Sequence, residues 1–115
     1  MWNCWASSSL EELPALELAA WKVYEVSSPH WEGRTRHFSG YNLTEMEGRA
    51  SSAIADFDSD AFVGITKSGR RYRLVGNRVT MGEQGDAGYV WDFFVARNQL
   101  FDIVDVSSEY KCERA

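Results

Sequence analysis

Arginines gather in one short segment of this chain. Arg70, Arg71 and Arg73 lie close together, and Arg78 follows a few residues later. A guanidinium group presents a rigid fork of N–H donors that binds carboxylates and phosphates through paired hydrogen bonds. Residues 61–82 hold five of the twelve basic side chains and no acidic one, although the chain carries a net charge of −5. This segment is therefore the strongest candidate for binding an anionic partner.

Two interpretations of the arginine segment stay open. Opposite charges commonly pair between neighbouring strands, so Asp56 or Asp58 could neutralise the arginines. Alternatively, the arginines remain free and bind a partner, with Tyr72 as a stacking surface if its ring is exposed. The acidic remainder of the chain should repel nucleic acid and anionic membranes, so the arginine segment is the one place where a nucleic acid could bind.

Aromatic side chains form a second group of candidates for partner contact. The chain contains five tryptophans, five tyrosines and six phenylalanines. Most of these rings are expected in the core. Trp2 and Trp5 are exceptions, because a terminal segment buries aromatic side chains only when it is held against the fold. We therefore add both tryptophans to the candidate partner-binding residues.

One acidic stretch resembles the start of a calcium-binding loop. Asp56, Asp58 and Asp60 alternate as the first ligands of such a loop do. The pattern then fails, since Ala61 stands where a glycine is needed and Lys67 where a bidentate glutamate is needed. The stretch is better explained as an acidic turn at the end of a sheet.

The remaining chemistry-bearing residues match no catalytic or metal-binding pattern. His30, Glu32 and His37 could form a metal site only if their strand folded back on itself, and Cys4 and Cys112 lie far from them in sequence. The chain contains no P-loop, dinucleotide fingerprint, nucleophile elbow or HExxH motif. We therefore expect no catalytic residues, no metal, no cofactor and no enzymatic activity.

The arginines should be positioned by a β-hairpin in residues 62–75. Ser68-Gly69 supplies a two-residue turn in which glycine tolerates a positive φ. This turn predicts three cross-strand pairs: Lys67 with Arg70, Ile65 with Tyr72, and Val63 with Leu74. Because side chains alternate between faces, the aliphatic residues and Tyr72 should share a buried face, and Arg71 and Arg73 should face water.

The flanking segments predict further strands and one helix. Strands are expected at 21–26, with a bulge, at 33–41, at 49–57 and, on a sheet edge, at 101–107. A short helical segment is expected within 9–19 and a mobile surface loop over 76–88. Asp86 is a candidate N-cap for a helix that reaches Asn98, and the apolar residues of that helix require it to be largely covered by the sheet.

These elements predict an α+β, β-dominant fold. An antiparallel sheet of about five strands should pack on one helix in the C-terminal half, and residues 1–115 should form a single domain. The start of the chain lacks the features of a secretory signal, and no apolar run reaches membrane-spanning length. We therefore expect a cytoplasmic protein that makes no membrane contact and keeps its two cysteines reduced.

Three segments carry a resemblance to small uncharacterised proteins of bacterial prophages and mobile elements. They are Gly48–Ile54, Thr66–Leu74 and Ala87–Trp91, and the resemblance spans roughly residues 34–98. It implies a role in the conflict between phage and host, as anti-CRISPR inhibitors and toxin-immunity proteins have. It implies a bacterial host cell and assigns no functional residues.

The expected function is that of a non-enzymatic inhibitor or adaptor that occludes a surface of a partner protein. Small size, acidity, aromatic richness and the missing catalytic motifs favour this class, and the acidic residues of 11–60 could mimic nucleic acid toward a basic channel. The alternative is a nucleic-acid-binding module that uses the basic strand Arg70–Arg78.

Overall fold

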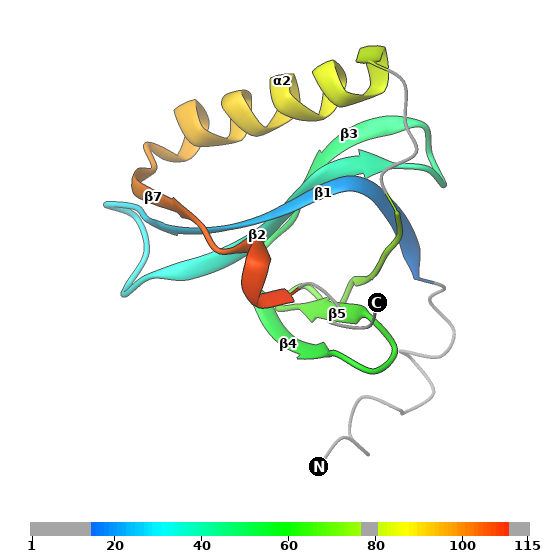
Figure 1. The fold of residues 1–115 in the computed structure, drawn as a ribbon. Helices are drawn as coiled ribbons and strands as arrows, with labels where there is room; N and C mark the ends of the chain where they lie inside the picture. Colours follow the sequence, from blue (N-terminus) through cyan, green and yellow to red (C-terminus); the bar gives the residue numbers. More distant parts are fainter. Residues whose placement is uncertain (1–14, 77–80, 111–115) are drawn as a thin grey trace.

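The structure, a computed structural model, describes residues 15–76 and 81–110. Within these ranges seven strands form one sheet, and one α-helix, α2 (Met81–Asn98), lies against it (Figure 1). A 3₁₀ turn, Ser107–Tyr110, follows the last strand. The strands are β1 (Leu16–Ser27), β2 (Thr35–Asn42), β3 (Glu47–Ala50), β4 (Ile54–Asp58), β5 (Val63–Thr66), β6 (Arg71–Leu74) and β7 (Phe101–Asp105). The predicted α+β, strand-dominant class is confirmed.

The sheet is mixed, with the strand order β3-β2-β1-β6-β5-β4. The long strand β1 pairs with β2 along one edge. Its other edge is shared by two strands: β6 pairs in parallel with Leu16–Leu18, and β7 pairs antiparallel with the stretch from Tyr24 to Ser27. The prediction of an antiparallel sheet of about five strands is therefore wrong in both strand number and strand direction.

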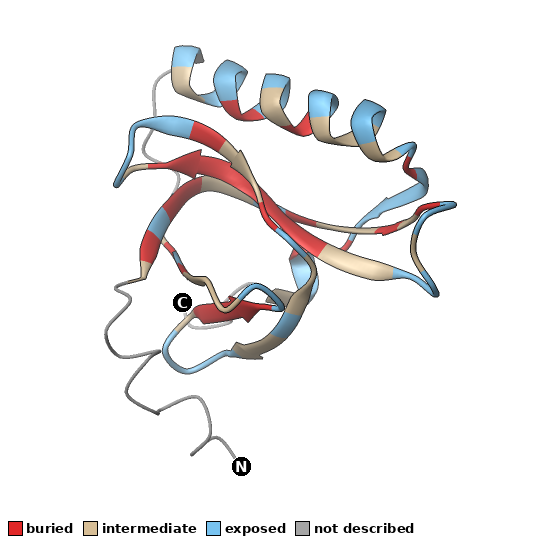
Figure 2. Ribbon diagram, turned by 180° about the vertical axis from the view of Figure 1, so that it is seen from behind, coloured by how far each residue is buried: buried red, intermediate tan, exposed pale blue. Residues whose placement is uncertain are grey.

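Two apolar cores lie on opposite faces of the sheet. The sheet curves so that β4 and β5 face the β1–β2 pair across an inner core, and α2 covers the outer face (Figure 1). Figure 2 shows buried residues in the strands and on the side of α2 that faces them. The inner core contains Leu16, Leu18, Val23, Phe38, Tyr72, Leu74 and Val106. The outer core contains Val26, Trp91 and Leu100.

A bulge in β1 allows this one strand to serve both cores. The pairing with β2 shifts by one residue within Ala19–Lys22, at the start of the segment 21–26 for which the sequence predicted a bulge, whereas Lys22–Val26 pair with β2 regularly. Before the bulge the even-numbered Leu18 points to the inner core, whereas after it the odd-numbered Val23 does so and Val26 enters the outer core. Gly40 lies opposite, and a Cβ there would meet the carbonyl oxygen of the bulge at 2.8 Å. The bulge thus requires glycine on β2.

The predicted β5–β6 hairpin exists, but its loop is one residue longer than predicted. The Gly69 N–H donates to Thr66 O over 2.8 Å, and the Thr66 N–H donates to Arg70 O over 3.0 Å. Gly69 has a φ of 90°. A positive φ is expected at the last residue of a three-residue hairpin loop, where a turn is followed by a bulge. The observed pairs are Val63 with Arg73, Gly64 with Tyr72, and Ile65 with Arg71.

This shift changes which side chains share a face of the hairpin. Tyr72 and Leu74 enter the inner core, where a Cβ on Gly64 would collide with the Phe38 ring. Val63 and Ile65 are also buried, but on the opposite face, which they share with Arg71 and Arg73. The predicted common face of the aliphatic residues and Tyr72 is therefore wrong, because one extra loop residue reverses the alternation.

Other boundaries also differ from the predictions. The segment from residue 16 to 19, expected to be helical, belongs to β1, and the rest of that predicted helix lies outside the described residues. Residues 49–57 form two strands rather than one. Helix α2 begins at Met81, within the predicted loop, and Asp86 lies inside it. The Asp86 carboxylate accepts the backbone N–H of Gly48 over 2.6 Å, so it ties α2 to β3 instead of capping the helix.

Candidate interaction surfaces

The arginine strand remains free of carboxylates within the part of the chain that the structure describes. Arg70, Arg71 and Arg73 make no ion pair there. Asp56 and Asp58 lie on β4, which pairs with β5 and not with β6, so the predicted neutralisation does not occur. The other predicted partner-binding residues, Arg78, Trp2 and Trp5, lie outside the described residues.

The three described arginines differ in exposure and direction. Arg73 is exposed and Arg70 half-buried. Arg71 is half-buried too, and its Nε is a buried donor without a hydrogen-bond partner. Tyr72 is only 2% exposed and accepts a hydrogen bond from Arg49 Nε over 3.0 Å, so it offers no stacking surface. The arrangement supplies charge and unused donors to an anion, without an aromatic platform.

A different pair of arginines has a structural role. Arg34 Nε donates to Glu25 over 2.8 Å, and Arg36 Nε donates to the same carboxylate over 2.9 Å. These hydrogen bonds lower the pKa of Glu25 below its ordinary value. Arg34 also donates to the backbone oxygen of Asp102 in β7, and Arg36 to Glu109. This network fastens β7 and the 3₁₀ turn to the β1–β2 hairpin.

Large apolar side chains lie exposed on α2 and β7. Tyr89 and Phe93, one turn apart on α2, are 71% and 60% exposed. Phe101, Ile103 and Val104 of β7 are 50%, 40% and 50% exposed. The expectation that the sheet would largely cover α2 is therefore wrong, because only one side of the helix is buried against the sheet (Figure 2). That side includes Ala87 and Trp91, and the helix lies mainly on β2 and β3.

Strand β7 is also an open edge, as the sequence predicted. It pairs with β1 and with no other described strand, and all five of its residues are exposed. An exposed strand edge presents unpaired N–H and C=O groups on which another strand can form a ladder. Phe101, Ile103 and Val104 add apolar contact area to that ladder. We refer to residues 101–105 as the β7 edge.

The three residues considered for a metal site do line one cavity, of about 420 Å³: His30, Glu32 and His37. His37 is 2% exposed, and both ring nitrogens are occupied, by Ser51 O at 2.9 Å and Thr35 Oγ1 at 2.7 Å. Burial lowers the pKa of His37 and keeps its ring neutral. No group of three metal-ligating side chains converges among the described residues. His37 is therefore a hydrogen-bonded residue of the core.

Comparison of the chain with protein-family models, curated proteins and solved structures gave no match. The resemblance to prophage and mobile-element proteins therefore stays a prediction. Among the described residues, no helix combines the length and apolar character needed to cross a bilayer. Functional inference rests on the surfaces of the fold itself.

Proposed function

We propose that this chain is a non-enzymatic binding protein, an inhibitor or adaptor that occupies a surface of a partner protein through the β7 edge. One observation carries the proposal: a strand with a free edge exposes three large apolar side chains. Natural proteins usually protect such edges with charges, prolines or a covering element, because an open apolar edge recruits other strands. A partner strand that extends the sheet would cover both the backbone groups and the apolar side chains.

The negative charge of the β7 edge limits the kind of partner segment that it can bind. Asp102 and Asp105 flank Ile103 and Val104 in the strand, and the whole chain carries a net charge of −5. A partner segment with Lys or Arg beside its apolar residues complements this pattern and associates faster at low salt. The favoured occupant is therefore an extended, basic segment of another protein.

Affinity capture with matched variants tests this proposal. Ile103→Lys and Val104→Lys place a charge on the edge, whereas Met46→Lys places one on an equally exposed apolar residue at the β2–β3 turn, which is 64% exposed. A partner cross-linked from bacterial lysate should be retained by the wild type and by Met46→Lys and lost with both edge variants. All three variants should unfold within about 0.5 kcal/mol of the wild type, because the sites are exposed.

Two outcomes would contradict the proposal. Equal retention by the edge variants and Met46→Lys would remove the β7 edge from the interface. Self-association in sedimentation equilibrium that Ile103→Lys abolishes would identify a second copy of the chain, rather than a different protein, as the occupant.

The second candidate function is nucleic-acid binding through the arginine strand. The observation that favours it is that Arg70, Arg71 and Arg73 lack ion pairs within the described residues and that Arg71 Nε lacks an acceptor. Binding to single- and double-stranded oligonucleotides should then fall steeply as salt rises. The double variant Arg71→Glu/Arg73→Glu should abolish it, and Arg97→Glu on α2 should retain most of it. No binding at low salt would exclude this function.

A further inference from the structure

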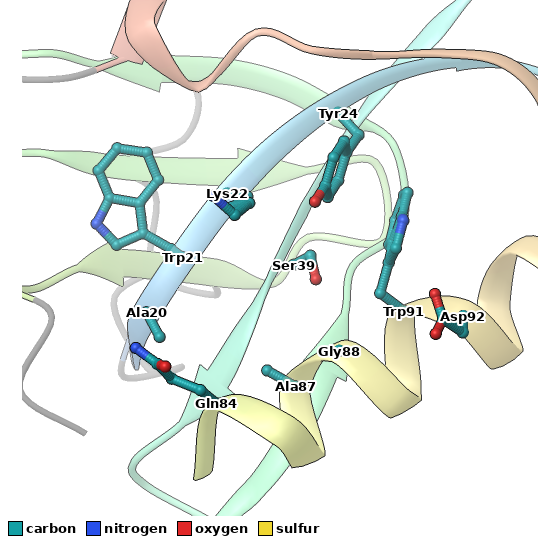
Figure 3. Close-up of a pocket in the computed structure, with 10 residues that line it drawn as sticks. All are labelled: Ala20, Trp21, Lys22, Tyr24, Ser39, Gln84, Ala87, Gly88, Trp91 and Asp92. Carbon is teal, nitrogen blue, oxygen red and sulfur yellow. The ribbon is translucent and has the colours of Figure 1, made fainter. Parts of the chain in front are cut away.

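A cavity of about 410 Å³ lies between the bulge of β1 and helix α2 (Figure 3). This volume is within the range of small-molecule sites. Ala20 of the bulge lines it with a φ of 50°, a left-handed conformation that alanine rarely adopts, and bulges and strained residues of this kind are frequent beside functional sites. The side chains that can supply chemistry there are Lys22, Tyr24, Ser39, Gln84, Trp91 and Asp92.

Three oxygen-bearing groups in the cavity have no partner in the described protein. Ser39 is only 6% exposed, yet its hydroxyl makes no hydrogen bond with a described residue. The Tyr24 hydroxyl, which is half-buried, likewise has none, and Asp92 on α2 forms no ion pair or hydrogen bond there. Figure 3 shows the hydroxyls of Tyr24 and Ser39 directed into the space between β1 and α2. The Ser39 and Tyr24 hydroxyls can therefore accept hydrogen bonds from a ligand that enters the cavity, and the exposed Asp92 carboxylate adds a negative charge to its lining.

The apolar part of the cavity is an aromatic wall. Tyr24 and Trp91 stack with ring centroids 4.5 Å apart and an interplanar angle of 18°. Ala87 and Gly88 carry little or no side chain where α2 borders the cavity, which leaves room beside the rings. An alkyl chain that lies along this wall buries its methylene groups, and a cation near the rings is attracted by their negative faces.

The electrostatics of the cavity favour a cation. Burial raises the pKa of Tyr24, and the carboxylates of Asp105 and Asp92 raise it further. The negative potential of the two carboxylates therefore reaches the phenol oxygen. Lys22 also lines the cavity, and its Nζ lies 3.9 Å from Asp105 Oδ2, so these two opposite charges offset each other and Asp92 supplies the remaining negative charge of the lining.

We propose that this cavity binds a primary alkylammonium group, with its nitrogen near the Ser39 and Tyr24 hydroxyls, its alkyl chain along the rings of Tyr24 and Trp91, and the Asp92 carboxylate at the border of the site. An ammonium carries three N–H donors and no acceptor, so both hydroxyls can accept from it, and the carboxylate complements its charge. The site differs from the β7 edge in location and chemistry, so it does not depend on the proposed function. Free alkylamines and lysine side chains of a partner share this chemistry.

Calorimetric titration with n-butylammonium chloride tests the proposal. The wild type should bind the amine, and n-butanol, which has a similar alkyl chain without the charge, should bind at least about tenfold more weakly. Asp92→Asn should weaken amine binding about tenfold or more, and Ser39→Ala should weaken it less. Asp60→Asn makes the same change on an exposed residue of the β4–β5 turn, outside the cavity, and should leave binding unchanged.

Two-dimensional NMR with the same probes locates the site and settles the source of the ammonium. The Trp91 indole and Ser39 amide signals should shift on titration with the amine. Tighter binding of Nα-acetyl-lysine amide than of n-butylamine would assign the group to a lysine side chain, and the reverse would assign it to a free amine. Absence of any shift in the wild type, or equal binding to Asp92→Asn and Asp60→Asn, would overturn the proposal.

Discussion

At the scale of single residues, the arginines of this chain divide by what they contact. Arg34 and Arg36 share the Glu25 carboxylate and fasten the end of the described chain to β1 and β2. Arg71 and Arg73 have no such carboxylate among the described residues. Charges that a fold does not use internally are available to a partner, whereas the Glu25 network contributes to stability.

The Glu25 network should give the fold a measurable sensitivity to acid. The pKa of Glu25 is lowered from 4.5, so its contribution to the free energy of unfolding is present above about pH 4.5 and is lost as the pH falls through the lowered value. Glu25→Gln should be less stable than the wild type at pH 7, and the difference should shrink below pH 4.5. Urea unfolding from pH 3 to pH 7 measures this. Glu32→Gln, which removes a carboxylate that makes no ion pair among the described residues, is the control. A constant difference for Glu25→Gln across this range would contradict the assignment.

His37 should produce a second pH dependence at higher pH. Burial lowers its pKa below 6.5, so the unfolded chain binds the proton more readily and the free energy of unfolding should fall as the pH drops below about 6.5. His30→Asn leaves His37 as the only histidine, and ring NMR signals in that variant report its titration directly. A His37 pKa at or above 6.5 in the folded protein would contradict this assignment.

At the scale of elements, local sequence patterns predicted most of the strands. They did not predict the register of the β5–β6 hairpin, which changes with a single loop residue. The bulge in β1, the β5–β6 hairpin and the edge strand β7 are all readable from alternation and turn residues. The predicted register of the hairpin is wrong because Ser68-Gly69 is compatible both with a two-residue turn and with the end of a three-residue loop. The choice between them depends on Gly64 meeting Phe38 in the inner core, a contact distant in sequence.

Two glycines on different elements should respond oppositely to alanine. Gly64→Ala places a Cβ against the Phe38 ring in the inner core and should cost about 1–3 kcal/mol of unfolding free energy. Gly85→Ala places one on α2 with nothing within 4 Å and should stabilise the fold by about 0.5–1 kcal/mol, because alanine favours helix. Urea unfolding of both variants measures this. A stabilising Gly64→Ala would show that the Phe38 ring moves aside freely.

The parts that sequence could not predict depend on contacts between distant segments. The parallel β1–β6 pair joins segments more than fifty residues apart, and β7 pairs with another part of the same edge of β1, an arrangement that no local pattern records. The outward exposure of Tyr89 and Phe93 depends equally on which side of α2 meets the sheet. Of the candidate site, the sequence predicted the arginine strand and the open edge of β7, but not the network around Glu25 or the cavity at the bulge.

At the scale of the whole molecule, β1 is the strand on which both cores depend. Val23 contributes to the inner core and Val26 to the outer core, and both are 0% exposed. Because β1 also pairs with β2, β6 and β7, loss of either core should disturb the pairing that the other requires. The two layers should therefore unfold as one unit.

Val23→Ala and Val26→Ala test this coupling. Each removes two buried carbon atoms and should cost about 2 kcal/mol, from lost burial and the cavity that remains. Each variant should still show one transition, with tryptophan fluorescence and far-UV circular dichroism changing together. Separate transitions in either variant would show that the inner and outer cores are independent.

The extra residue at the β1 bulge affects which deletions in this strand the protein can tolerate during evolution. Two residues, Ala20 and Trp21, face one position of β2, so removing either of them would leave the later pairs, such as Val23 with Phe38, in register. The side chains after the bulge would keep their faces, with Val23 in the inner core and Val26 in the outer core. A single-codon deletion at the bulge should therefore be tolerated, whereas a deletion after it, at Tyr24, would move Val26 to the opposite face and should disrupt folding.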